Sequence, residues 1–260
     1  MHDWFFSTSV IRNQYAVLRQ WSVEGTRPRV PTALRYMLPA VILLCTLFIP
    51  LTPHSTFPVS SSTHPPLTYV AIGASDTFGV GTDDPLTESW PSDLARQLGN
   101  QIHLVNLGIP GLLAHNALTR SLPIALDAHP QLITIWLAVN DLAANVALES
   151  YQQDLEQLVA QLQKGLPQAR IVLANVPDLT LLPHFKAMDG DVLRKQIDDY
   201  NSTIVTLADH HHIVLVDLYQ QWKALAQHPE YISDDGFHPS ASGYAQLAEI
   251  FYNTLQKQAL

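Results

Sequence analysis

From residue 67 to the end of the chain, short apolar runs alternate with longer segments of helical period, and this alternation constrains the fold more than any other feature. A short apolar run bounded by turn residues is typical of a buried strand. Five such runs are expected to be strands: Leu67 to Ile72, Ile102 to Leu107, Leu132 to Val139, Arg170 to Val176 and Ile213 to Leu218.

The segments between these runs have the period of amphipathic helices. The clearest has its apolar residues on one face over Leu148 to Leu166. Further helices are expected at Glu88 to Leu98, Asn116 to Asp127, Asp191 to His210 and Ala241 to Gln256. Strands joined by crossover helices form a parallel sheet that is covered on both faces, so the pattern predicts a doubly wound α/β fold. In such a sheet, functional sites form at the carboxyl ends of the strands.

Polar and glycine residues follow the first three expected strands. Ser75 comes just after the first strand, where Gly73 permits a sharp turn. The second strand runs into the glycine-punctuated segment Asn106 to Gly111, which can bring a backbone N–H close to a ligand. Asn140 follows the third strand, where its amide can donate to a developing oxyanion. Taken one at a time, these features also fit a helix-capping serine and two ordinary turns.

A carboxylate and an imidazole lie three residues apart before the last expected helix. Asp235 and His238 both belong to the turn Ser233 to Ser240. At this spacing the carboxylate can hold one imidazole nitrogen while the other nitrogen faces outward, as a general base requires. For this turn alone, a local ion pair without a catalytic role is the alternative.

Together, the four loops resemble the SGNH, or GDSL-type, hydrolase family. Four blocks match in order: Tyr69 to Gly81 is similar to the serine block, Asn106 to Gly111 to the glycine block, Val139 to Asp141 to the asparagine block and Asp235 to Tyr244 to the Asp-x-x-His block. The resemblance covers about residues 67 to 257. It implies ester hydrolase activity and a flavodoxin-like three-layer α/β/α sandwich with a five-stranded parallel sheet.

The resemblance also implies roles for individual residues. Ser75 is the expected nucleophile, His238 the general base and Asp235 the residue that orients His238. The expected oxyanion donors are the N–H groups of Ser75 and Gly108 and the side-chain amide of Asn140. These residue types suit the chemistry, because a serine hydroxyl is a poor nucleophile until a base takes its proton. No metal and no organic cofactor is expected.

The sequence departs from the family pattern at two positions. Ala74 stands where the family has the aspartate of Gly-Asp-Ser, and Asp76 follows the serine as a candidate replacement. Ala138 stands where the asparagine block begins with glycine, and its methyl group can narrow the mouth of the acyl site. Neither departure removes a nucleophile, a base or an oxyanion donor.

A separate apolar stretch precedes the folded region. No charged side chain lies between Arg35 and Asp76, and Tyr36 to Leu51 is almost entirely apolar. Its 16 residues would rise about 24 Å as a helix, slightly less than a hydrocarbon core of about 30 Å. We therefore expect residues 36–51 to be a transmembrane anchor or an uncleaved signal. A cleaved secretory signal and a buried core helix are the alternatives. Lipidation of Cys45 is disfavoured because the preceding Leu44 is not small.

The distribution of charge predicts how the chain is oriented across the membrane. Residues 1–35 hold five arginines against Asp3 and Glu24, a net charge of +3, which predicts a basic cytoplasmic tail. The chain is then a single-pass membrane protein with its C-terminal domain extracytoplasmic, or a secreted protein if the N-terminal segment is cleaved. Residues 52–66, with four prolines and many hydroxyl residues, are expected to be a linker to the hydrolase domain of residues 67–260.

Composition argues against several other kinds of protein and of binding site. The remainder of the chain carries a net charge of −12 within the overall −9, which argues against a nucleic-acid partner. The single cysteine excludes an internal disulfide and a multi-cysteine metal site. His210, His211 and His212 follow an expected helix, where imidazoles are electrostatically favoured, and we expect them to be solvent-exposed without a metal.

The sequence therefore predicts a membrane-anchored, extracytoplasmic serine ester hydrolase. Its substrate class is an acyl ester of a small molecule, lipid or carbohydrate, and its oligomeric state stays open. One alternative, motivated by Ala74 and Ala138, is a catalytically silent binding module with the same fold. The other is a cell-envelope interaction protein whose acidic face docks a partner.

Overall fold

The computed structural model describes residues 66–223 and 227–257. Five parallel strands form one sheet in the order β2-β1-β3-β4-β5. Their bounds are β1 Leu67–Gly73, β2 Ile102–Gly108, β3 Leu132–Trp136, β4 Arg170–Ala174 and β5 Val214–Val216. The expected anchor, residues 36–51, and nearly all of the expected linker lie outside the described residues. Within the described ranges, no helix combines the length and the apolar character needed to cross a membrane.

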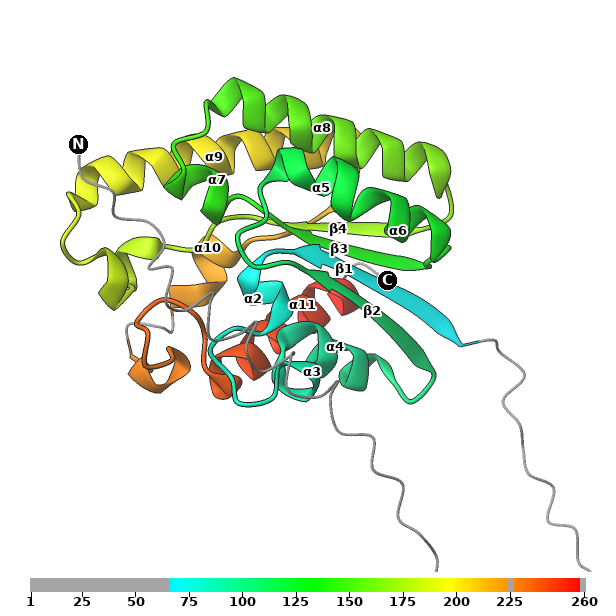
Figure 1. The fold of residues 1–260 in the computed structure, drawn as a ribbon, viewed down its shortest axis with the longest axis horizontal. Coiled ribbons are helices and arrows are strands. Elements are labelled where there is room, and N and C mark those ends of the chain that lie inside the picture. Colours follow the sequence, from blue (N-terminus) through cyan, green and yellow to red (C-terminus); the bar gives the residue numbers. More distant parts are fainter. Residues whose placement is uncertain (1–65, 224–226, 258–260) are drawn as a thin grey trace, which may run out of the picture. The chain divides into compact units, whose positions relative to one another are not determined.

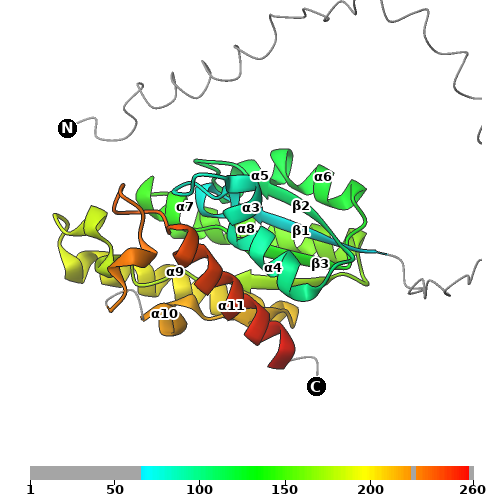
Figure 2. The same ribbon diagram turned by 90° about the horizontal axis from the view of Figure 1, so that it is seen from below.

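Helices cover both faces of the sheet (Figure 1). One face carries α5 Ala114–Arg120, α6 Leu122–Asp127, α8 Leu148–Gly165 and α9 Gly190–His211. The other carries α4 Trp90–Leu98 and α11 Ala241–Lys257, which pack side by side (Figure 2). The remaining helical segments are short: α2 Ser75–Phe78, α3 Pro85–Glu88, α7 Val139–Ala143, α10 Leu218–Gln221, η2 Leu179–Leu181, η3 Pro183–Phe185 and η5 Pro229–Tyr231. The predicted doubly wound α/β fold with a five-stranded parallel sheet is thus confirmed.

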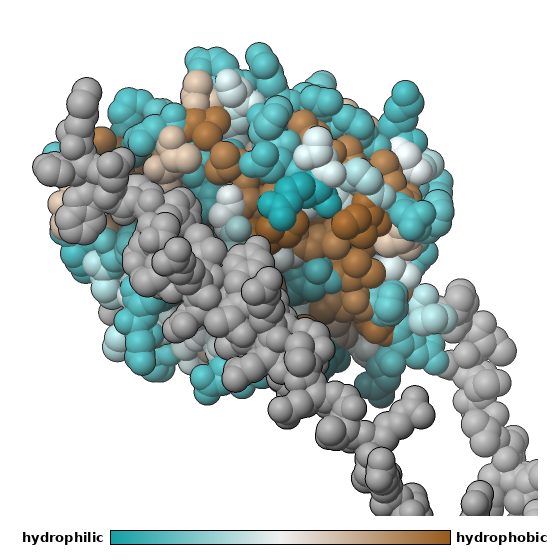
Figure 3. Space-filling model, in the orientation of Figure 1, coloured by the Kyte–Doolittle hydropathy of each residue, from teal (hydrophilic) through white to brown (hydrophobic). Residues whose placement is uncertain are grey.

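The helices are held to the sheet by the apolar stripes that predicted them. On α8, the buried stripe consists of Tyr151, Leu155, Leu158, Val159 and Leu162. On the opposite face, Phe251 of α11 stacks on Trp90 of α4 with ring centroids 4.2 Å apart. Both aromatic side chains are fully buried. Figure 3 shows hydrophobic residues gathered over the edge strand β2, whose residues are mostly only half-buried.

The strand order places a topological switch point between β1 and β3. The chain first moves from β1 to β2 on one side and then returns to build β3, β4 and β5 on the other side. The register pairs Gly73 of β1 with both Gly108 of β2 and Trp136 of β3, so the three strands end level with one another. The loops that follow them therefore start at one place, where ligands bind in sheets of this type.

The structure corrects several expected boundaries. Strand β3 ends at Trp136, and Val139 already belongs to α7. The apolar run continues past the strand because Leu137, Ala138 and Val139 stay buried outside the sheet. Strand β5 is shorter than expected, because Leu218 begins α10.

The expected helix at residues 116–127 is also divided, into α5 and α6. The break lies at Ser121, directly before the first turn of α6, which contains Pro123. A proline removes a backbone donor and clashes with the preceding turn, so it is tolerated at a helix start but not in the interior. A new helix begins there as a result.

Candidate active site

Ser75 lies directly beyond the carboxyl end of β1, as the first residue of α2. Its backbone carbonyl accepts hydrogen bonds from Gly79 and Val80, each at 3.0 Å, and the residue is 8% exposed. Gly73 is required for this turn, because a Cβ there would overlap the Thr77 hydroxyl and lie 3.0 Å from the Trp136 carbonyl oxygen. The backbone around the serine is therefore fixed by close contacts between β1, α2 and β3.

Asp235 and His238 form the predicted carboxylate–imidazole pair. Asp235 Oδ2 lies 2.5 Å from His238 Nδ1. The other oxygen, Oδ1, accepts from Ser233 Oγ at 2.9 Å, from Phe237 N at 2.8 Å and from His238 N at 2.9 Å. Burial alone would raise the pKa of Asp235, but the hydrogen bonds from the His238 ring and from these N–H groups outweigh it, and the pKa is lowered. An ionised Asp235 accepts from Nδ1–H and so leaves the lone pair of the imidazole on Nε2.

His238 Nε2 is buried, and it has no hydrogen-bond partner among the described residues. Two contacts join its loop to the segment after α2. Tyr244 Oη donates to the Val80 carbonyl at 2.7 Å, and a Cβ on Gly81 would lie 2.5 Å from the Pro239 carbonyl oxygen and 3.1 Å from His238 Cβ. No hydrogen bond between Ser75 and His238 is present within residues 66–223 and 227–257. Such bonds are often long in a free enzyme and shorten when substrate binds.

Asp76 is a second carboxylate close to the imidazole. Burial raises its pKa, the nearby charge of His238 lowers it, and the charge of Asp235 raises it further. Asp76 also contributes to raising the pKa of Tyr244 well above its ordinary value, although burial is the main cause. The aspartate that follows the serine therefore lies in the electrostatic environment of the Asp235–His238 pair.

The structure conflicts with the predicted role of the Gly108 N–H. This N–H donates to Asn106 Oδ1 at 2.9 Å, and Asn106 Nδ2 in turn donates to the Thr77 carbonyl at 2.8 Å. A Cβ on Gly108 would overlap the backbone nitrogen of Phe78. Gly108 therefore permits β2 to contact α2 closely, while its own N–H is already engaged.

For the neighbouring Gly111, no role was predicted, and its N–H has no acceptor among residues 66–223 and 227–257. Leu112 N donates to the Ile109 carbonyl at 3.0 Å, closing a turn in which Pro110 and Gly111 are the central residues. Gly111 has φ +77°, as the third position of a type II turn requires. The Pro-Gly dipeptide was the signal that could have identified this position.

Asn140 lies beside that turn. It belongs to the first turn of α7, and its Nδ2 donates to the Leu112 carbonyl at 3.1 Å, which leaves the second amide hydrogen for a ligand. The next residue, Asp141, accepts from Ala114 N at 3.1 and 3.3 Å and is 1% exposed. Burial raises the pKa of Asp141 to about 6. Adjacent residues of the asparagine block thus hold both ends of the segment from Leu112 to Ala114.

An apolar pocket of about 360 Å³, including its opening, lies at this end of the sheet. Three aromatic side chains line it, those of Trp136, Trp222 and Phe237, together with aliphatic side chains. Asp76 is the one carboxylate in its wall within the described residues, and Val139 from the start of α7 is also present. Since Asp76 and Val139 directly neighbour Ser75 and Asn140 in the chain, the pocket adjoins the predicted catalytic residues.

The chain is similar to known proteins in sequence and in fold. The GDSL-like lipase/acylhydrolase family matches residues 71–246. An arylesterase from Vibrio mimicus is 25% identical over 186 residues, which make up 70% of this chain and 86% of the relative. A putative GDSL-like lipase from Parabacteroides merdae superposes with a TM-score of 0.63 at 21% identity, covering 73% of this chain and 95% of that one. TesA superposes with a TM-score of 0.60 at 23% identity, covering 73% and 98%.

The family match spans the serine, glycine, asparagine and Asp-x-x-His blocks in order, and the described residues have the fold of the solved relatives. The chain therefore belongs to the GDSL-like lipase/acylhydrolase, or SGNH hydrolase, family and is an ester hydrolase.

Proposed function

We propose that this protein hydrolyses carboxylic esters through an acyl-enzyme formed on Ser75. The proposal rests on the arrangement of His238. Asp235 holds its Nδ1 at 2.5 Å, and its buried Nε2 has no hydrogen-bond partner in the part of the chain that the structure describes. A neutral imidazole in this tautomer is the group best suited to take the serine proton near neutral pH.

The reaction proceeds in two stages. Nε2 of His238 takes the proton of Ser75 Oγ as that oxygen attacks the ester carbonyl carbon. The tetrahedral intermediate then collapses, the C–O bond to the alcohol breaks, and His238 returns the proton to the leaving alkoxide. In the second stage, water loses a proton to His238 and attacks the acyl carbon, and the acid leaves as Ser75 Oγ is reprotonated. Asp235 stabilises the imidazolium that forms in each stage.

Three donors are assigned to the oxyanion. Ser75 N–H and the free amide hydrogen of Asn140 keep their predicted roles. We assign the third donor to Gly111 N–H rather than Gly108 N–H, because Gly108 donates to Asn106 whereas the turn containing Gly111 is bonded to Asn140 through Leu112. Donors fixed in this way stabilise the developing charge without reorganisation during the reaction.

The apolar lining of the pocket favours esters with an apolar group. Aromatic and aliphatic side chains line most of it, which differs from the polar surface that a sugar needs. Aryl esters or esters of short to medium acyl chains are the substrates that we propose, in line with the similarity to the Vibrio mimicus arylesterase.

A panel of esters tests the activity and the pocket together. With p-nitrophenyl acetate, butyrate, octanoate and palmitate, we expect kcat/KM to be highest for the shorter chains and to fall steeply at palmitate. Ser75→Ala is the control, and its kcat/KM should be lower than that of the wild-type protein by several orders of magnitude. Equal rates for the wild-type protein and for Ser75→Ala would overturn the mechanism, and a maximum at palmitate would overturn the substrate assignment.

We further propose that residues 36–51 anchor the protein in a membrane with the hydrolase domain outside the cytoplasm. The apolar run at these residues and the +3 charge of residues 1–35 support this orientation. Protease should digest the hydrolase domain when it is added to cells that have lost their outer layers but whose cytoplasmic membrane is still closed. Digestion only after the membrane is broken would contradict the proposal.

A further inference from the structure

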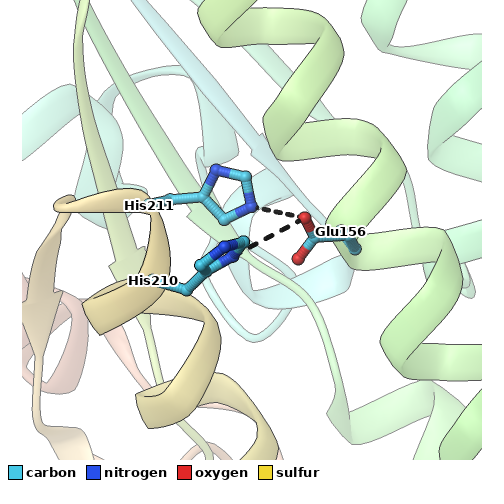
Figure 4. Close-up of side chains that lie close together, drawn as sticks. All are labelled: Glu156, His210 and His211. Carbon is cyan, nitrogen blue, oxygen red and sulfur yellow. Dashed lines mark hydrogen bonds and ion pairs between the residues drawn. The ribbon is translucent and has the colours of Figure 1, made fainter.

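Three potential metal ligands from two helices converge at the end of α9. Glu156 extends from α8 toward His210 and His211, the last two residues of α9 (Figure 4). One ligand atom of each residue lies within 4.8 Å of the others. Because α9 ends here and β5 starts at Val214, the cluster lies where strands begin. Ser75 follows the opposite, carboxyl end of its strand, so the cluster is separate from the active site.

His211 is held in one orientation. Its side chain is only 10% exposed, which contradicts the expectation that it is solvent-exposed. Gln163 Nε2 donates to the His211 carbonyl at 2.9 Å, so the amide oxygen of Gln163 is the atom that faces His211 Nδ1, at 2.7 Å. Nδ1 must therefore carry a hydrogen, since an amide oxygen only accepts. The ring is fixed with Nε2 directed at Glu156 Oε1, 2.7 Å away.

Two arrangements satisfy this geometry. In one, Nε2 also carries a hydrogen, and an imidazolium pairs with the carboxylate. In the other, the Nε2 lone pair and the Glu156 oxygen both bind a cation. A metal-bound histidine usually donates its second ring N–H to a carbonyl or carboxylate oxygen, and Gln163 supplies that acceptor here. His210 Nδ1 lies 3.9 Å from the same Glu156 oxygen, which adds a third ligand that a simple ion pair does not need.

The ligand set and its spacing suit a zinc-like ion. Two imidazoles with a carboxylate are a ligand set known from zinc enzymes, in which water takes the fourth position. Bonds of about 2.0–2.1 Å in a tetrahedron place ligand atoms roughly 3.3 Å apart, a value between the observed 2.7 and 3.9 Å. The side chains of His210 and Glu156 are 73% and 42% exposed, so they can rotate into place while His211 stays fixed. The negative end of the α9 dipole also favours a cation.

We propose that Glu156, His210 and His211 bind Zn²⁺ or a chemically similar divalent transition metal that fastens α8 to α9. The ion stabilises the fold and takes no part in ester hydrolysis.

Zinc titration of the full, untagged chain after metal removal tests the site. Calorimetry should show saturable binding whose affinity falls at least tenfold in His210→Ala and in Glu156→Gln. Zn²⁺ at 100 times its Kd should raise Tm by about 5–10 °C. Co²⁺ in its place should give the intense visible absorption of a tetrahedral site. Gln163→Met, which removes the acceptor for Nδ1–H, should lower the affinity about 10- to 100-fold.

His228→Ala is the matched control, because His228 pairs with Glu230 at 2.8 Å and this pair does not belong to the cluster. Its zinc affinity should equal that of the wild-type protein. Because His210 is exposed, His210→Ala should keep the wild-type rate of ester hydrolysis, which confirms that it is folded. Absence of saturable binding would overturn the proposal. Binding that persists unchanged in His210→Ala and Glu156→Gln would overturn it equally, since the ion would then be held elsewhere.

Discussion

Replacing Asp141 by asparagine should change how the stability of the protein depends on pH. Asp141 is 1% exposed and accepts from Ala114 N, and burial raises its pKa from 3.8 to about 6. The folded state therefore binds a proton at this group more readily than the unfolded state does. Its contribution to the free energy of unfolding is fully present below about pH 4 and is lost as the pH rises through about 6.

The magnitude follows from the size of the shift. A shift from 3.8 to about 6 at 1.36 kcal/mol per unit corresponds to about 3 kcal/mol. Asparagine keeps an oxygen that can accept from Ala114 N, but it stays neutral at every pH. The free energy of unfolding of the wild-type protein, minus that of Asp141→Asn, should therefore fall by about 3 kcal/mol between pH 4 and pH 7.

Urea unfolding of both proteins at half-unit pH steps measures this difference. Asp199→Asn is a suitable control, because Asp199 pairs with Lys195 at 2.7 Å on an exposed helix surface, where an ion pair contributes about 0–1 kcal/mol. A wild-type minus Asp141→Asn difference that stays constant, or that rises with pH, would refute the reasoning.

Two further predictions concern catalysis, and a third concerns the close contact between β2 and α2. Asn140→Ala should lower kcat by about 10²- to 10³-fold, because it removes one oxyanion donor, and the protein should stay folded although the bond to the Leu112 carbonyl is lost; initial rates and calorimetry measure both. A wild-type kcat would contradict the assignment. Asp235→Asn should lower kcat by about 10⁴-fold, because an amide can hold the wrong tautomer of His238. Normal turnover of an ester substrate by this variant would remove Asp235 from the mechanism. Gly108→Ala should lower both the Tm and the yield of folded protein, because its Cβ would overlap the backbone of Phe78; an unchanged Tm would show that β2 and α2 can separate.

The parts of the fold that could be predicted are those with a sequence period. The leucines of α8 repeat at helical spacing and are buried as a stripe. The end of β3 has no such signal, since Leu137 and Ala138 are as apolar as the strand and remain buried beyond it. The apolar character of a residue predicts that it is buried. It does not predict where a strand ends, because that depends on backbone hydrogen bonds that the local sequence does not specify.

The same distinction applies to the site. The pairing of Asp235 with His238 was predictable, because three residues within one turn bring the two side chains together. The hydrogen bond of the Gly108 N–H was not predictable. Its acceptor is the side chain of Asn106, and that amide is held in place by the carbonyl of Thr77 in α2. His211 was placed at a helix end correctly, but its burial depends on Gln163 of another helix. Interactions within one loop can be predicted from the sequence, whereas interactions between separate helices and strands can be identified only once the fold is known.

Covalent labelling of Ser75 tests the central claim most directly. A fluorophosphonate that reacts with activated serines should modify the wild-type protein at one site, and mass spectrometry of the digested protein should locate the adduct on Ser75. His238→Ala should react far more slowly, because the hydroxyl then lacks its base. Labelling at another residue, or equal rates of Ser75 labelling with and without His238, would contradict the mechanism.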